Sequence, residues 1–160
     1  MKVKWSVGSG IGKYISSLEK LNLATELQIR MAVYDGAGVI ADEVKKRIDA
    51  MPTQDVPHAD RVTGIKTIQK KGLQHGFGIS RMKTEGDSTN VKLGFDGYNY
   101  LKSKKYPNGQ PNAMIARTFE SGNSFTKKIP FVAPAIRAKR SEAEKAMARV
   151  IDEEVQLIMS

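Results

Sequence analysis

The feature that most constrains the fold is a long run of regularly spaced apolar side chains that ends at Pro52. Between Thr25 and Met51, apolar residues recur every three or four positions, which is the spacing of one helix face. The members are Leu27, Met31, Tyr34, Ala37, Ile40, Ala41, Val44, Ile48 and Met51. Proline ends such a helix, and Thr25 with Gln28 forms a capping-box pattern at its start. The pattern predicts one helix over 25–51.

Two glycines interrupt this predicted helix. Gly36 and Gly38 each cost about 1 kcal/mol relative to alanine in a helix interior. They lie near the small residues Ala37 and Ala41. We therefore expect another backbone to approach this face closely.

Several shorter segments alternate apolar with polar residues or glycine, the period of a half-buried strand. They are residues 3–7, 77–79 and 91–95, with a further short strand expected at 65–68. The turn-forming residues 84–89 separate two of these segments and predict an antiparallel hairpin with a longer loop. His75 is expected to be a partly exposed strand residue.

Helical spacing recurs at 11–21, at 113–119 with Gly122 placed to stop the helix, and from Pro134 to the end. Loops are expected at 52–64 and 123–131. The prediction is an α+β fold, in which a small antiparallel sheet packs with a long central helix and a long C-terminal helix. Residues 1–160 would form a single domain.

The net charge of +9 is unevenly distributed. Residues 101–140 contain nine basic side chains against Glu120, a local net charge of +8, whereas residues 141–160 have a net charge of −3. The polar segment 97–112 contains Tyr98, Tyr100 and Tyr106 among its lysines, a composition that suits nucleic acid or an acidic protein surface. We expect this loop to be mobile, and a purely solubilising role stays open. The candidate interface or DNA-facing residues are Lys102, Lys104, Lys105, Lys127 and Lys128.

Catalytic and cofactor sites are not indicated. The chain has no cysteine and two histidines, His58 and His75, neither at metal-ligand spacing. The glycine cluster at 8–13 fails both the phosphate-loop and the dinucleotide-binding patterns. The carboxylate groups Asp42-Glu43 and Asp152-Glu153-Glu154 have the pattern of exposed helix faces. We expect no enzyme activity, cofactor, metal or small-molecule substrate. We also expect no membrane span and no signal peptide, hence synthesis in the host cytoplasm.

Three segments, in order, resemble the minor structural proteins of tailed phages that complete the tail or join it to the head. The first is Thr63-Gly64-Ile65-Lys66-Thr67-Ile68, which follows a proline-containing loop. The second runs from Ile115 to Gly122 and contains Glu120 two residues before the glycine. The third is Pro130-Phe131-Val132-Ala133-Pro134-Ala135, before the last helix. Phe131 is expected to anchor the chain on the core, and Glu120 to accept backbone or arginine hydrogen bonds.

The resemblance implies a virion protein of the tail or neck region that forms a ring, expected to be a hexamer. It would contact tail-tube and head–tail adaptor proteins and the passing DNA. Tail completion, tail termination and neck-adaptor roles stay open, as do contractile and non-contractile tails and infectious or bacteriocin-like particles. The main alternative is a basic DNA-binding module. The high net charge predicts an isolated chain that is monomeric or weakly associated.

Overall fold

The computed structural model describes residues 2–6, 26–56, 60–86 and 88–159. The chain divides into two compact units, each built from discontinuous stretches. Unit 1 comprises Met1–Val3, Asp42–Gly78 and Gly94–Arg137; unit 2 comprises Lys4–Ala41, Ile79–Leu93 and Ala138–Ser160. The architecture is α+β, as the sequence predicted. The helix predicted for 11–21, the glycine cluster at 8–13 and His58 lie outside the described residues.

The sheet follows the alternating segments closely. Its strands are β1 (Lys2–Ser6), β2 (Phe77–Ile79), β3 (Lys83–Glu85) and β4 (Ser88–Phe95). The strand order is β1-β4-β2, and β3 also pairs with β4. The β3–β4 pairing is antiparallel, with Thr84 opposite Thr89, and Gly86 takes the positive φ of +59° that the turn requires. The predicted hairpin is therefore confirmed, with part of its expected loop forming β3.

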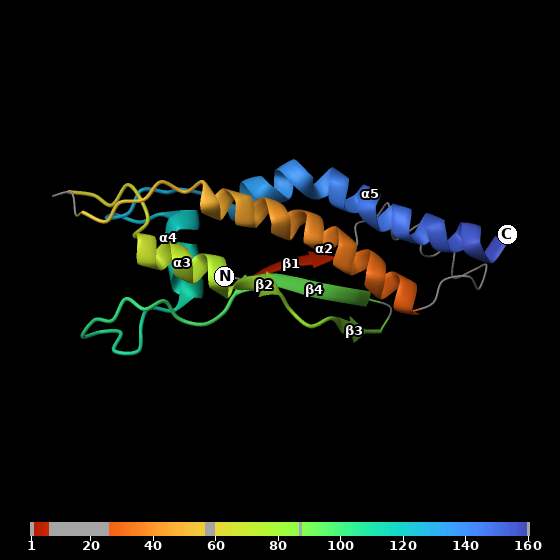
Figure 1. Ribbon diagram of the computed structural model, residues 1–160, viewed down its shortest axis with the longest axis horizontal. Helices are drawn as coiled ribbons and strands as arrows, with labels where there is room; N and C mark the ends of the chain where they lie inside the picture. The colour runs from red at the N-terminus through yellow and green to blue at the C-terminus, as the bar shows by residue number, and fades with distance from the viewer. Residues whose placement is uncertain (1, 7–25, 57–59, 87, 160) are drawn as a thin grey trace. The chain divides into compact units, whose positions relative to one another are not determined.

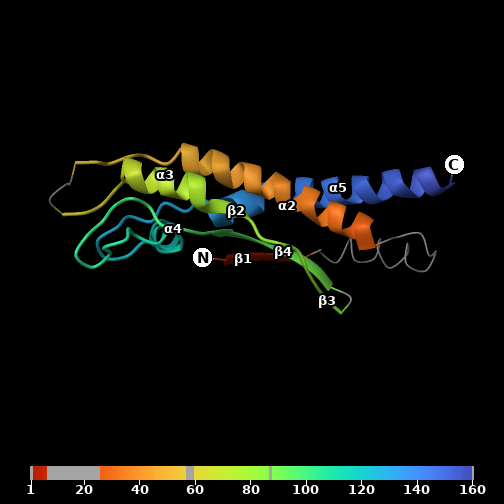
Figure 2. The same ribbon diagram turned by 60° about the horizontal axis from the view of Figure 1, so that its bottom comes forward.

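Four helices are described: α2 (Glu26–Asp49), α3 (Thr67–Gly76), α4 (Asn112–Ser121) and α5 (Val132–Met159). Within unit 2, the first part of α2 and the later part of α5 run antiparallel and side by side in both views (Figures 1 and 2). They bury mostly small and aliphatic side chains. These are Ala32, Val33, Ala37, Ile40 and Ala41 from α2, and Ala143, Met147 and Ile151 from α5.

The first turns of α2 depart from the prediction. Leu27, Met31 and Tyr34 are exposed, with relative exposures of 63%, 52% and 42%. At about 100° per residue, they lie roughly 60–120° around the helix from Ala37, the centre of the buried face. These residues keep the helical spacing of three and four, but they lie on a side of the helix that faces away from the core. The expected close backbone approach is also wrong at Gly38, because a Cβ there would meet nothing within 4 Å.

The strand predicted at 65–68 is wrong, and α3 begins there instead. Ile65 forms only an isolated parallel bridge with Thr53. The Asp55 carboxylate accepts hydrogen bonds from Thr67 N (2.8 Å) and Thr67 Oγ1 (2.6 Å), and Gln69 Oε1 accepts one from Lys66 N (3.2 Å). These side chains satisfy N–H groups that a new helix leaves without partners. His75 consequently lies on a helix and is exposed, rather than on a strand.

A pair of buried asparagines organises the contact between α3 and α4 in unit 1. Asn99 and Asn112 are only 2% and 3% exposed. Asn112 Nδ2 donates to the Asp96 carbonyl at 2.9 Å, and its side chain lies against Gly72 and Gly76, where any Cβ would overlap it. Two glycines one helical turn apart on α3 therefore form the notch that receives Asn112.

Candidate interaction surfaces

The first of the three sequence segments forms a short parallel pairing in unit 1. Ile65 N donates to the Pro52 carbonyl (2.9 Å), and Gln54 N donates to the Ile65 carbonyl (2.8 Å). The Gln54 side chain accepts hydrogen bonds from Thr63 N (2.7 Å) and Gly64 N (3.1 Å). A Cβ on Gly64 would lie 2.7 Å from the Pro52 oxygen, so this backbone approach requires glycine.

The second and third segments meet at the start of α5. Glu120 Oε2 accepts hydrogen bonds from Phe131 N (2.8 Å) and Val132 N (2.9 Å), and its Oε1 accepts one from Ala133 N (2.9 Å). A carboxylate at a helix N-terminus satisfies unpaired N–H groups and interacts favourably with the helix dipole. The expectation that Glu120 accepts backbone hydrogen bonds is confirmed. Its role is to cap α5, the helix that follows the next loop.

The neighbouring motif residues support this junction. Phe131 is 1% exposed, and its ring meets Phe95 edge-on at 5.9 Å, so its predicted place in the core is confirmed. Pro134 lies in the first turn of α5, where its missing N–H costs no helical hydrogen bond. Gly122 ends α4 with a φ of +68°, and the exposed Pro130 precedes Phe131.

Backbone hydrogen bonds made by the residues that flank the three segments connect them. Val62 N donates to the Phe125 carbonyl and Lys127 N donates to the Val62 carbonyl, both at 2.8 Å, which pairs the loop before α3 with the loop after α4. Ile129 N then donates to the Phe119 carbonyl at 2.8 Å. The segments that are separate in the sequence are thus one continuous hydrogen-bonded structure within unit 1.

A cavity of about 360 Å³ lies in this part of unit 1. Met114, Ile115 and Phe119 of α4 contribute apolar surface, and Val56 and Val62 come from the loop before α3. Lys66 is the one charged side chain among the described residues that line it, and the other polar groups are amides and hydroxyls such as Gln54, Gln69 and Thr118. Such a lining suits an aliphatic side chain with an acidic neighbour.

The exposed surface around the cavity combines apolar and basic side chains. Val56, Val62 and Phe125 are 77%, 41% and 75% exposed. Lys127, which bonds to Val62 through its backbone, and Lys128 are both exposed, as expected for interface residues. We call the surface formed by Val56, Arg61, Val62, Lys66, Phe125 and Lys127 the loop face. The acidic side chains nearest in sequence are Asp55, which is bonded to Thr67, and the exposed Asp60.

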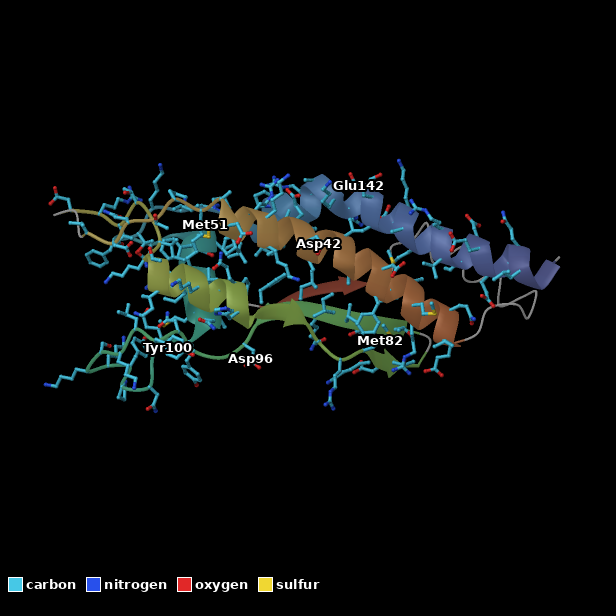
Figure 3. The ribbon with its side chains drawn as sticks, viewed as in Figure 1. Asp42, Met51, Met82, Asp96, Tyr100 and Glu142 are labelled. Atoms are coloured by element: carbon cyan, nitrogen blue, oxygen red, sulfur yellow. The ribbon has the colours of Figure 1, made fainter. Side chains whose placement is uncertain are left out.

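The second basic surface is the 97–112 loop. Lys102, Lys104 and Lys105 are exposed, as are Tyr98 and Tyr100 at 62% and 82%. Figure 3 labels Tyr100 among the side chains of this loop. The loop is not without structure. Asn99 Oδ1 accepts hydrogen bonds from Leu101 N (2.9 Å) and Gln110 N (3.2 Å), and Ser103 and Tyr106 exchange backbone hydrogen bonds of 3.0 and 3.1 Å. Its predicted mobility stays a prediction.

The acidic and hydroxyl side chains considered as catalytic candidates do not form one cluster. Asp42 is exposed, Glu43 pairs with Arg47 at 2.9 Å, and Ser80 Oγ is bonded to its own strand pair through Lys92 N at 2.9 Å. Hydrogen bonds from Thr67 Oγ1 and Thr67 N lower the pKa of Asp55 below its ordinary value of 3.8, which reflects its capping role. Among the described residues, no group of three histidine or acidic side chains is placed to hold a metal ion. None of the described helices is long and apolar enough to cross a membrane.

Sequence reasoning missed Gln54, Asp55, Asn99 and Asn112, the polar residues that hold the loops of unit 1 together. The glycine spacing in α3 was the available signal for Asn112. No signal in the sequence indicated the others, because their partners lie 2 to 12 residues away in irregular loops.

Comparison with known proteins gives no match to a family model, to a curated protein or to a solved structure.

Proposed function

We propose that this chain is a structural subunit of a tailed phage or phage-derived particle. It completes or terminates the tail and joins it to the head or neck as an oligomeric ring. The observation that carries the proposal is the convergence of the three resembling segments in unit 1. Val62 bonds to the 123–131 loop, Ile129 bonds to Phe119, and Glu120 caps α5. The three segments, together with the residues that flank them, thus build a single junction.

The surroundings of this junction support a binding role. Apolar, amide and hydroxyl side chains and one lysine line the cavity, and none of the described residues that line it is a carboxylate or a histidine. Exposed apolar side chains next to basic ones, as on the loop face, are typical of protein interfaces. An assembly protein works through such surfaces, without a cofactor.

The test is to purify particles from a strain that lacks this chain and from the same strain supplied with it. We expect particles without the chain to have unjoined heads or tails of irregular length, and supplied particles to contain a ring of several copies at the head-proximal tail end. Electron microscopy and quantitative mass spectrometry would measure both. One copy per particle, or joined particles of normal length without the chain, would overturn the proposal.

The second candidate is a DNA-binding module, favoured by the exposed Tyr98 and Tyr100 beside three lysines on one hydrogen-bonded loop. Tyrosine faces stack bases, and lysines neutralise phosphates. A gel shift across a salt series discriminates, since phosphate contacts make affinity fall steeply as salt increases. Tight, salt-sensitive binding of the free chain to DNA, together with absence from particles, would favour this candidate.

A further inference from the structure

Val56 and Phe125 of the loop face are 77% and 75% exposed, and the chemistry of the face indicates what would bind there. It includes a cavity of about 360 Å³ that is lined by apolar, amide and hydroxyl side chains, with the exposed Val56 among them. Lys66 also lines the cavity, and the exposed Arg61, Phe125 and Lys127 are the sequence neighbours of its lining residues Val62 and Thr126. A fitting occupant presents an aliphatic side chain together with carboxylates, because the aliphatic group fills the cavity and the carboxylates neutralise the cations.

The end of α5 has this chemistry. Glu142 and Glu144, earlier in the helix, pair with Lys139 and Arg140. Asp152, Glu153 and Glu154 form no ion pair with any described residue, and no basic residue follows them. Leu157, which is 72% exposed, lies one helical turn beyond Glu153 and Glu154. The last turns of α5, near the C label in Figure 1, therefore present carboxylates and an aliphatic group together.

We propose that the loop face of one copy binds the acidic end of α5 of a second copy. The two surfaces differ, so the contact is head-to-tail, and repetition of a head-to-tail contact generates a closed ring or a filament. The inference rests on the proposed function, because a ring subunit needs such a contact. It goes further by assigning the surfaces. One consists of carboxylates that form no ion pair with any described residue, and the other is the cavity lined by Lys66 together with the basic residues next to its lining in the sequence.

Charge reversal tests the pairing. The rim variant is Arg61→Glu with Lys127→Glu, and the helix variant is Glu153→Lys with Glu154→Lys; both alter exposed or half-exposed side chains. In sedimentation of concentrated full-length protein at low salt, we expect wild-type chains to associate and each variant alone to associate at least tenfold more weakly. A mixture of the two variants should recover association, because the reversed rim then meets a reversed helix. Lys102→Glu with Lys104→Glu is the matched control and should behave as wild type.

A crosslink tests the geometry independently of charge. The chain contains no cysteine, so Val56→Cys in one copy and Glu153→Cys in another introduce the only thiols. We expect mild oxidation of the mixture to give the mixed disulfide, and Tyr100→Cys in place of Val56→Cys to give much less. Equal yields, single variants that associate like wild type, or a mixture that recovers nothing would each overturn the contact.

The contact and the proposed function fail in different ways. If the rim and helix variants both enter particles at the normal copy number, the contact is wrong and the tail function stands. If the mixed disulfide forms but no particle contains the chain, the tail function is wrong and the contact stands.

Discussion

Glu120 Oε2 accepts a hydrogen bond of 2.8 Å from the backbone N–H of Phe131, so the last turn of α4 holds the start of α5. We expect Glu120→Gln to lower the free energy of unfolding by about 1–2 kcal/mol, because an amide keeps one acceptor and loses the charge that favours a helix N-terminus. Urea titration measures the change. Glu142→Gln, which removes only an exposed pair with Lys139, is the control and should cost less than about 0.5 kcal/mol. Equal effects would show that the cap contributes nothing.

Phe131→Ala should destabilise the chain by about 3–5 kcal/mol, the usual cost of truncating a fully buried aromatic side chain. The lost contact includes the edge-on packing against Phe95. Denaturant unfolding checks it, and a loss below about 1 kcal/mol would contradict the core position of this ring.

Gly72→Ala should cost about 1–3 kcal/mol, because the added methyl group overlaps the Asn112 side chain and forces α3 and α4 apart. Gly38→Ala is the matched control, also within a helix but with no atom within 4 Å of the new Cβ. That change should stabilise the chain by about 0.5–1 kcal/mol. The unfolding temperatures of the two variants should thus shift in opposite directions relative to wild type. Shifts of the same sign would contradict the close packing of Asn112 against Gly72 and Gly76.

Asp55 makes stability depend on pH in a defined direction. Its pKa is lowered in the folded chain, so its contribution is present above the ordinary carboxyl value of 3.8 and is lost as pH falls through the lowered pKa. We expect Asp55→Asn to be less stable than wild type near neutral pH and the gap to narrow below pH 3.8. Unfolding curves of both chains across acidic pH measure the gap. A gap that stays constant with pH would exclude this carboxylate as the source.

Replacing Lys102, Lys104 and Lys105 with glutamate should leave the unfolding temperature nearly unchanged, since all three side chains are exposed. The same variant should lower the yield of joined, DNA-filled particles while tails of normal length still form. Particle counts by electron microscopy decide between this outcome and a purely solubilising loop, for which the yield would be normal.

The regular elements followed from the sequence because their signals are local. Alternation predicted β2 and β4, and helical spacing with a proline or glycine stop predicted α2 and α4. The strand expected at 65–68 is wrong, because a four-residue segment with apolar residues only at Ile65 and Ile68 carries less weight than the Asp55 cap that starts α3. The exposed face of Leu27 and Met31 was missed for a related reason. Spacing defines a stripe, but only packing against other elements decides where the stripe leaves the core.

The candidate site was predicted in part. Glu120, Phe131 and Gly64 were selected by resemblance, and their contacts now have physical reasons in a cap, a buried ring and a close backbone approach. The cavity itself was not predicted. It depends on the pairing of Val62 with Thr126, which are 64 positions apart in the chain, and no local pattern encodes such a pairing.

Both units are assembled from stretches that are far apart in the chain, and this determines when each core can close during synthesis. Unit 1 needs residues up to Arg137, and unit 2 needs the final helix. Most of the chain must therefore be synthesised, at about 5–20 residues per second, before either core is complete. Long-range pairings of this kind slow folding, since the entropy of closing a large loop is lost before any stabilising contact forms. A nascent chain that has not yet reached Arg137 therefore lacks a finished unit 1, and with it a finished loop face.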